Sequence, residues 1–132
     1  MVVNASSIGP CDTVLVTVDV ANTGTVAGDE VVQLYVKTPT ASVPAPLVRL
    51  ADFERVHIAA GGKTTVSLLL TPKYHSVVHD AGKDAFWTPS IVVEAGTISL
   101  HVGGGQPEFT SGVRGSSLHI EHEGKLTTQY TC

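Results

Sequence analysis

The sequence predicts an all-β fold: a β-sandwich of about seven antiparallel strands, in a single domain that spans residues 1–132. Three observations lead to this prediction. Apolar residues alternate with polar ones in several segments, as they do in strands that bury one face. Thirteen glycines and seven prolines are spread along the chain and separate these segments by turns. Valine is frequent among the apolar residues, and β-branched side chains suit a pleated, half-buried surface.

The segment from Val14 to Val36 predicts the first two long strands. In the first, four valines recur at every second position, and in the second the same spacing continues through Val32, Leu34 and Val36. The linker between them, residues 21–29, contains an asparagine and two glycines, which tolerate the positive φ of a tight turn. We therefore expect the two strands to be antiparallel, paired either directly or across an edge of the sandwich.

The next part of the chain predicts a loop, a bulged strand, a turn and a further strand. Residues 38–46 contain three prolines, which remove ladder donors and indicate a surface loop. Residues 48–58 are extended, with a bulge expected at Ala51-Asp52 because the large apolar residues cannot all share one face at period two. A hairpin-type turn is expected at residues 60–63, followed by a strand with the alternating pattern of residues 64–70.

The last part of the chain predicts shorter elements. Pro72 at the first position of a helical turn fits the segment 71–75, since proline there gives up no helical hydrogen bond. The glycine-rich segment from Gly103 to Gly115 is expected to be an exposed connection. The remaining elements are a turn at 79–83, a strand start at 84–87, a turn at 94–96, a strand through Ile98, Leu100 and Val102, and a final strand at about 117–123.

The composition excludes several classes of partner. The formal net charge is −4, and there is no basic stripe of the kind that neutralises nucleic-acid phosphates or anionic lipid. There is no apolar run of about 20 residues, the length that a membrane span requires. The N-terminus has no basic and apolar leader, so we expect Met1 to initiate a mature or excised segment. We expect no nucleic-acid partner, no membrane partner, no cofactor and no metal site.

Two features favour an extracellular, secreted protein. Asn4-Ala5-Ser6 is an N-glycosylation sequon, although so short a pattern also arises by chance. Cys11 and Cys132 lie near opposite ends of the chain, without a second ligand at zinc-site spacing. A disulfide between them would close a loop of about 120 residues and add roughly 4–5 kcal/mol in the chain-entropy model. Two unpaired thiols, with Cys132 in a frayed end, remain the alternative.

Three ordered blocks of sequence carry a family resemblance. They are NTGTVAGDEVVQLYV (22–36), FERVHIAAGGKTTVSLLLTP (53–72) and VVEAGTISLHVGG (92–104). Together they resemble the immunoglobulin-like, fibronectin type III-like domain that closes glycoside hydrolase family 3 enzymes, the β-glucosidases and β-xylosidases. The resemblance covers about residues 11–104 and the final strand. The sequence departs from the family pattern at Asp52, where a glycine is usual, and members usually have another strand before the segment that begins here.

The resemblance implies a non-catalytic role, because the catalytic residues of such enzymes lie on other domains. The module would brace the catalytic domains by packing against them. The alternative is a free-standing secreted protein that binds a polysaccharide or a cell-surface receptor, including an immunomodulatory role. A sandwich separated from its parent exposes the former interface as an apolar patch, which favours homodimer formation.

Few residues suggest chemistry. Glycoside hydrolysis requires two facing carboxylates about 5–10 Å apart, and most acidic residues here are expected in turns or on solvent faces. The histidines, among them His75 and His79, are expected to be polar surface residues. Sugars stack on exposed aromatic rings, and Tyr74, Phe86 and Trp87 are the candidates for a ligand contact, although a tryptophan in a sandwich is more often part of the core. We assign Tyr35 and Phe53 to the core.

Overall fold

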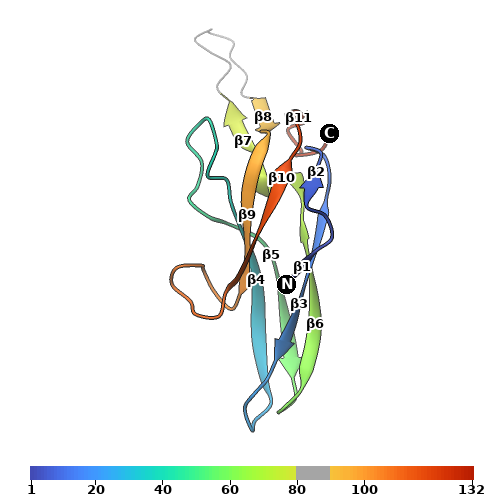
Figure 1. The fold of residues 1–132 in the computed structure, drawn as a ribbon, viewed down its shortest axis with the longest axis vertical. Helices are drawn as coiled ribbons and strands as arrows, with labels where there is room; N and C mark the ends of the chain where they lie inside the picture. The colour runs from blue at the N-terminus through green and yellow to red at the C-terminus, as the bar shows by residue number, and fades with distance from the viewer. Residues whose placement is uncertain (80–89) are drawn as a thin grey trace.

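The computed structural model describes residues 1–79 and 90–132 and shows the expected all-β architecture, with strands that run along its long axis (Figure 1). The described residues form eleven strands rather than the expected seven, because several short pairings accompany the long strands. The expected strand start at 84–87, and most of the turn at 79–83, lie outside the described residues. The elements are β1 (Val2–Val3), β2 (Ser7–Ile8), β3 (Val14–Ala21), β4 (Gly28–Lys37), β5 (Arg49–Ile58), β6 (Lys63–Leu70), the 3-10 helix η1 (Pro72–His75), β7 (Val77–His79), β8 (Ser90–Val93), β9 (Gly96–Gly103), β10 (Arg114–Ile120) and β11 (Gly124–Leu126).

The strands form three sheets. The order is β1-β3-β6 in the first, β2-β10-β9-β4-β5 in the second and β11-β8-β7 in the third. All pairs are antiparallel except β2 with β10, which is parallel and corrects the fully antiparallel prediction. β7 and β8 lie at one end of the molecule, and the β3–β4 connection lies at the opposite end (Figure 1).

The two strands of the segment 14–36 lie in different sheets, which settles an alternative that the sequence left open. β3 pairs with β1 and β6, whereas β4 pairs with β5 and β9. The turn at 60–63 likewise leads from one sheet to the other, so the expectation of a hairpin there is wrong. Gly61 has a φ of 69°, and the Gly62 N–H donates to the Ala59 carbonyl at 2.8 Å. Both connections therefore join the two layers of the sandwich.

The main core is formed by residues of the β1-β3-β6 sheet and of the five-stranded sheet, with Val93 and Leu126 from the third. Alternate positions of the long strands point inward, and Val14 and Val16 of β3 are fully buried. Val18 and Val20 continue the same face but are only half-buried. The remaining residues of the main core are Ile8, Val32, Leu34, Val36, Ala51, Val66, Leu68, Leu70, Val93, Ile98, Leu100, Val102, Leu118, Ile120 and Leu126.

The bulge expected at Ala51-Asp52 is present and determines which residues of β5 face solvent. Leu34 pairs with Asp52 and Tyr35 pairs with Leu50, so Ala51 has no partner of its own. Beyond the bulge the alternation is reset, and Phe53 points outward with 62% of its surface exposed. The assignment of Phe53 to the core is therefore wrong, whereas the assignment of Tyr35, which is 7% exposed, is confirmed.

Asp52 closes a strand edge beside this bulge. Its carboxylate accepts hydrogen bonds from the N–H of Phe53 at 2.8 Å and from the N–H of Leu69 at 2.9 Å. β6 is an edge strand, so the Leu69 N–H points away from its only neighbour in the sheet. An unpaired edge is a site of aggregation, and a carboxylate that satisfies the edge donor protects it. The residue that departs from the family pattern thus links the two sheets.

Replacement of Asp52 tests this contact. We expect Asp52→Ala to lower the free energy of unfolding by about 1–2 kcal/mol, because it removes two hydrogen bonds to a charged acceptor. Asp52→Asn, which keeps one acceptor oxygen, is expected to lose less. Urea denaturation measures both values. An alanine variant as stable as the parent would show that water replaces the carboxylate at no cost.

Candidate functional site

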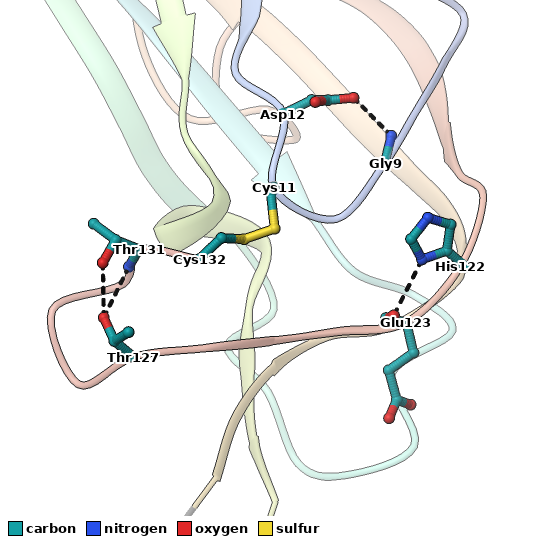
Figure 2. The surroundings of a disulfide bond; sticks show 8 residues. All are labelled: Gly9, Cys11, Asp12, His122, Glu123, Thr127, Thr131 and Cys132. Atoms are coloured by element: carbon teal, nitrogen blue, oxygen red, sulfur yellow. Dashed lines mark hydrogen bonds between the residues drawn. A yellow bond between two sulfur atoms is a disulfide. The ribbon is translucent and has the colours of Figure 1, made fainter.

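A disulfide joins Cys11 to Cys132, across a sequence separation of 121 and with 5.9 Å between the Cα atoms (Figure 2). Cys11 lies in the turn between β2 and β3, where the carboxylate of Asp12 accepts a hydrogen bond from the Gly9 N–H at 2.8 Å. Of the two alternatives for the cysteines, the structure has the bonded one. The bond attaches the C-terminal segment to this turn, so the end of the chain is held in place.

The C-terminal segment is itself a compact turn. The Thr127 N–H donates to the Thr131 carbonyl at 2.7 Å, and the Tyr130 N–H donates to the Thr127 carbonyl at 2.9 Å. The hydroxyl oxygens of Thr127 and Thr131 are 2.8 Å apart (Figure 2). Tyr130 has a φ of 61°, a left-handed conformation that is uncommon for residues other than glycine. The turn and the disulfide together fix the backbone at Tyr130.

Tyr130 faces a cleft that we call the tyrosine cleft. The Lys73 ammonium lies 5.4 Å from the ring centroid of Tyr74 and 5.4 Å from that of Tyr130, within the range of cation–π attraction. The cleft has a volume of about 450 Å³. Its lining residues are Pro44, Pro46, Arg49, Leu50, Lys73, Tyr74, Ser76, Val77, Val78 and Tyr130.

The tyrosine cleft is positively charged. Arg49 is half-buried, and burial lowers the pKa of its guanidinium. Within the described part of the chain, neither Arg49 nor Lys73 forms a salt bridge with a carboxylate. Nearby, His75 is 2% exposed, and its two ring nitrogens have no hydrogen-bond partner in the described structure. Burial, and then the charge of Arg49, lower the pKa of His75 to about 4. The expectation that His75 is a surface residue is wrong, because η1 turns its ring into the protein.

A second surface is formed by the loops 38–48 and 104–113, which project from the same side of the molecule (Figure 1). We call it the loop surface. It contains a groove of about 670 Å³ between the two loops, and its lining includes a Lys37–Glu108 ion pair of 2.5 Å. Leu47 and Phe109 line the groove and are 91% and 83% exposed. Large apolar side chains that are exposed to this extent are typical of a surface that contacts a partner.

Glu94 holds the first of these loops against the β8–β9 turn. The Ser42 N–H donates to Oε1 of Glu94 at 3.0 Å, the Ser42 hydroxyl donates to Oε2, and His79 Nε2 lies 3.1 Å from Oε2. Burial acts to raise the pKa of Glu94, but the hydrogen bonds from Ser42 and His79 outweigh it and lower that pKa. The loop is therefore anchored at Ser42 by an ionised carboxylate.

The structure describes two of the remaining candidates, Tyr74 and Asn4. Tyr74 lines the tyrosine cleft, whereas Phe86 and Trp87 lie outside the described residues. Asn4 is exposed, and its Oδ1 accepts a hydrogen bond from the Leu15 N–H at 3.1 Å. Its glycosylation stays a prediction. Tyr130 was not among the sequence candidates. It joins the cleft through the C-terminal turn, which is attached to the β2–β3 turn by the disulfide that the sequence left open.

Several of the described acidic residues interact with basic or polar groups. Asp29, for example, lies 2.6 Å from His57 Nδ1 and 2.9 Å from the Arg55 guanidinium, and hydrogen bonds from His57 and Arg55 lower its pKa. Within residues 1–79 and 90–132, no group of three histidine, cysteine or acidic side chains is arranged to hold a metal ion. In the same residues, no helix is long and apolar enough to cross a membrane.

Comparison with known proteins identifies relatives of this domain. A β-xylosidase of Formosa agariphila is 39% identical over 98 residues, which cover 74% of this chain and 13% of that enzyme. A β-glucosidase of Rhizobium radiobacter is 44% identical over 62 residues, which cover 47% of this chain and 8% of the enzyme. The chain therefore spans only a small part of the length of the relatives that it matches.

Solved structures give the same result. The β-glucosidase of Listeria innocua in complex with gluconolactone matches 92% of this chain, with a TM-score of 0.76 and 25% identity, over 15% of its own length. A β-glucosidase of Erythrobacter marinus matches 89% of this chain, with a TM-score of 0.73 and 28% identity, over 14% of its own length. The sequence profile of the fibronectin type III-like domain matches residues 30–106, more than half of the chain. The chain therefore belongs to the fibronectin type III-like domain family, in the form found at the C-terminal end of family 3 glycoside hydrolases.

Proposed function

We propose that this chain is a non-catalytic accessory module of a secreted family 3 glycosidase and that it braces the catalytic domains by packing against them. The observation that carries the proposal is the family membership, combined with matches that cover 13% of the β-xylosidase and 15% of the Listeria β-glucosidase. A domain that forms so small a part of such enzymes supplies surface rather than a complete active site. The acidic residues support this reading, because Asp29 and Glu94 are bound to basic or hydroxyl partners instead of facing a second carboxylate.

The loop surface is the part of the module that we assign to this contact. Leu47 and Phe109 would bury apolar surface worth about 25 cal/mol per Å² when covered by a neighbouring domain. The groove between them is polar at one side, where Lys37 pairs with Glu108. An apolar centre with a polar rim is the usual anatomy of a protein interface. The Glu94 anchor keeps the first loop in position before docking, which lowers the entropic cost of association.

A domain exchange tests the proposal. The segment of the Formosa agariphila β-xylosidase that matches this chain is deleted and then replaced by the chain. We expect deletion to lower the melting temperature and the activity, and the exchange to restore part of both. The double variant Leu47→Asp/Phe109→Asp is expected to cancel this recovery, because it places two charges in the contact.

Val26→Asp is the matched control for these substitutions. Val26 is 76% exposed but lies in the β3–β4 connection, at the opposite end of the molecule from β7 and β8 (Figure 1). It should restore activity as well as the unmodified chain does. The isolated chain should release no sugar from an aryl glucoside or xyloside. Hydrolysis by the chain alone would contradict the proposed non-catalytic role. Full recovery of activity with the double variant would contradict the assignment of the loop surface to the contact.

A further inference from the structure

We propose that the tyrosine cleft binds a carboxylate-bearing sugar, such as a uronic acid unit of an acidic polysaccharide. The inference does not depend on the bracing role: it concerns the cleft around Arg49, Lys73 and the two tyrosines, to which loop 38–48 contributes only Pro44 and Pro46. It rests on three features of the cleft: positive charge that no described carboxylate pairs with, two tyrosine rings, and a strained backbone at the residue that carries one of these rings.

The positive charge of the tyrosine cleft favours an anionic ligand. Arg49 and Lys73 converge on one cleft of a protein whose formal net charge is −4. Arg49 is half-buried, and in the described structure no carboxylate forms a salt bridge with it or with Lys73. A cation that is partly removed from water is costly unless an anion pairs with it. The planar guanidinium can donate two parallel hydrogen bonds to a carboxylate, so a carboxylate ligand fits Arg49 well.

The two aromatic rings favour a ligand that has an apolar face, such as a pyranose ring. Tyr74 and Tyr130 flank the Lys73 ammonium at equal distances of 5.4 Å, and Pro44 and Pro46 line the same cleft. The C–H face of a pyranose ring packs on such surfaces, while its hydroxyl groups reach polar groups at the rim. The volume of about 450 Å³ lies within the range of about 300–1,000 Å³ for ligand pockets.

The backbone conformation of Tyr130 supports a functional role for this residue. A residue other than glycine at a φ of 61° is strained, and it persists only where the surrounding structure determines it. Here the surrounding structure is the Thr127–Thr131 hydrogen bonds and the Cys11–Cys132 disulfide. Strain of this kind concentrates at ligand contacts, and the side chain that it positions is the one that completes the cleft.

Calorimetry with two matched trisaccharides tests the proposal. We expect trigalacturonic acid to bind, and the neutral galactotriose to bind at least about tenfold more weakly, since one charge-assisted contact is worth a factor of that order. Arg49→Gln, Lys73→Gln and Tyr130→Ala are each expected to weaken trigalacturonate binding about tenfold. Lys125→Gln, which removes an exposed cation on β11, should leave binding unchanged. Melting temperatures establish that each variant is folded.

His75 provides an independent readout. An anion at Arg49 offsets the positive charge that helps to lower the pKa of His75, so trigalacturonate should raise the titration midpoint of His75 in NMR spectra. Galactotriose should not change it. The proposal is overturned if trigalacturonate does not bind at about 10 mM, a concentration that would detect even weak affinity. It is also overturned if both trisaccharides bind equally, if hexaglutamate binds as tightly as trigalacturonate, or if Lys125→Gln weakens binding as much as Lys73→Gln.

Discussion

Loss of the Cys11–Cys132 disulfide is expected to lower the free energy of unfolding by about 4–5 kcal/mol in the chain-entropy model. The bond spans a sequence separation of 121 and so restricts almost the whole unfolded chain. In the folded state the bond positions the C-terminal turn but adds little energy of its own, because the hydrogen bonds through Thr127 and Thr131 already form that turn. The stabilisation thus comes mainly from the lost entropy of the unfolded state.

Guanidinium denaturation of the oxidised protein, with and without dithiothreitol, measures this effect. The double variant Cys11→Ser/Cys132→Ser should match the reduced protein and should not respond to reductant. An oxidised protein whose midpoint is unaffected by dithiothreitol would show that the bond does not form in solution. Because the same bond holds Tyr130, reduction should also weaken any ligand of the tyrosine cleft while the sandwich stays folded.

The sequence was a good guide where local pattern and burial agree. The valines of β3 and the alternation of β4, β6 and β9 follow from period two, and each strand appears where the pattern indicates. The bulge at Ala51 was predictable because large apolar residues conflicted with strict alternation. These features follow from the sequence of each strand itself, because any strand with one buried face alternates in this way whichever strand it pairs with.

The sequence-based predictions fail where a tertiary contact determines the local structure. β1 and β2 are two-residue pairings that only the partners β3 and β10 create. Phe53 appears apolar enough for the core, yet the reset alternation after the bulge turns it outward. The tyrosine cleft joins residues from β5, η1 and the C-terminal turn, and it exists only because the disulfide fixes that turn. No spacing in the sequence relates Arg49 to Tyr130.

Acidification should destabilise the protein through His75 alone by about 3 kcal/mol between pH 7 and pH 4. The buried ring is held neutral, with its pKa lowered to about 4 from an ordinary value of 6.5 by burial and by the charge of Arg49. The unfolded chain binds a proton at His75 once the pH falls below 6.5, whereas the folded chain does not bind it until about pH 4. The stability that neutral His75 contributes is therefore fully present above about pH 6.5, and it is lost progressively as the pH falls from 6.5 to 4.

Comparison with His75→Leu isolates this contribution. The carboxylates with lowered pKa values, such as Asp29 and Glu94, also cost stability on acidification, but mainly below the ordinary carboxyl pKa and equally in both proteins. The difference in unfolding free energy between the two proteins should thus shift by about 3 kcal/mol in favour of the variant between pH 7 and pH 4. His119→Gln, which alters an exposed histidine, should keep the pH dependence of the parent. A difference between parent and His75→Leu that stays constant across this range would mean that water reaches the ring and that His75 titrates freely in the folded protein.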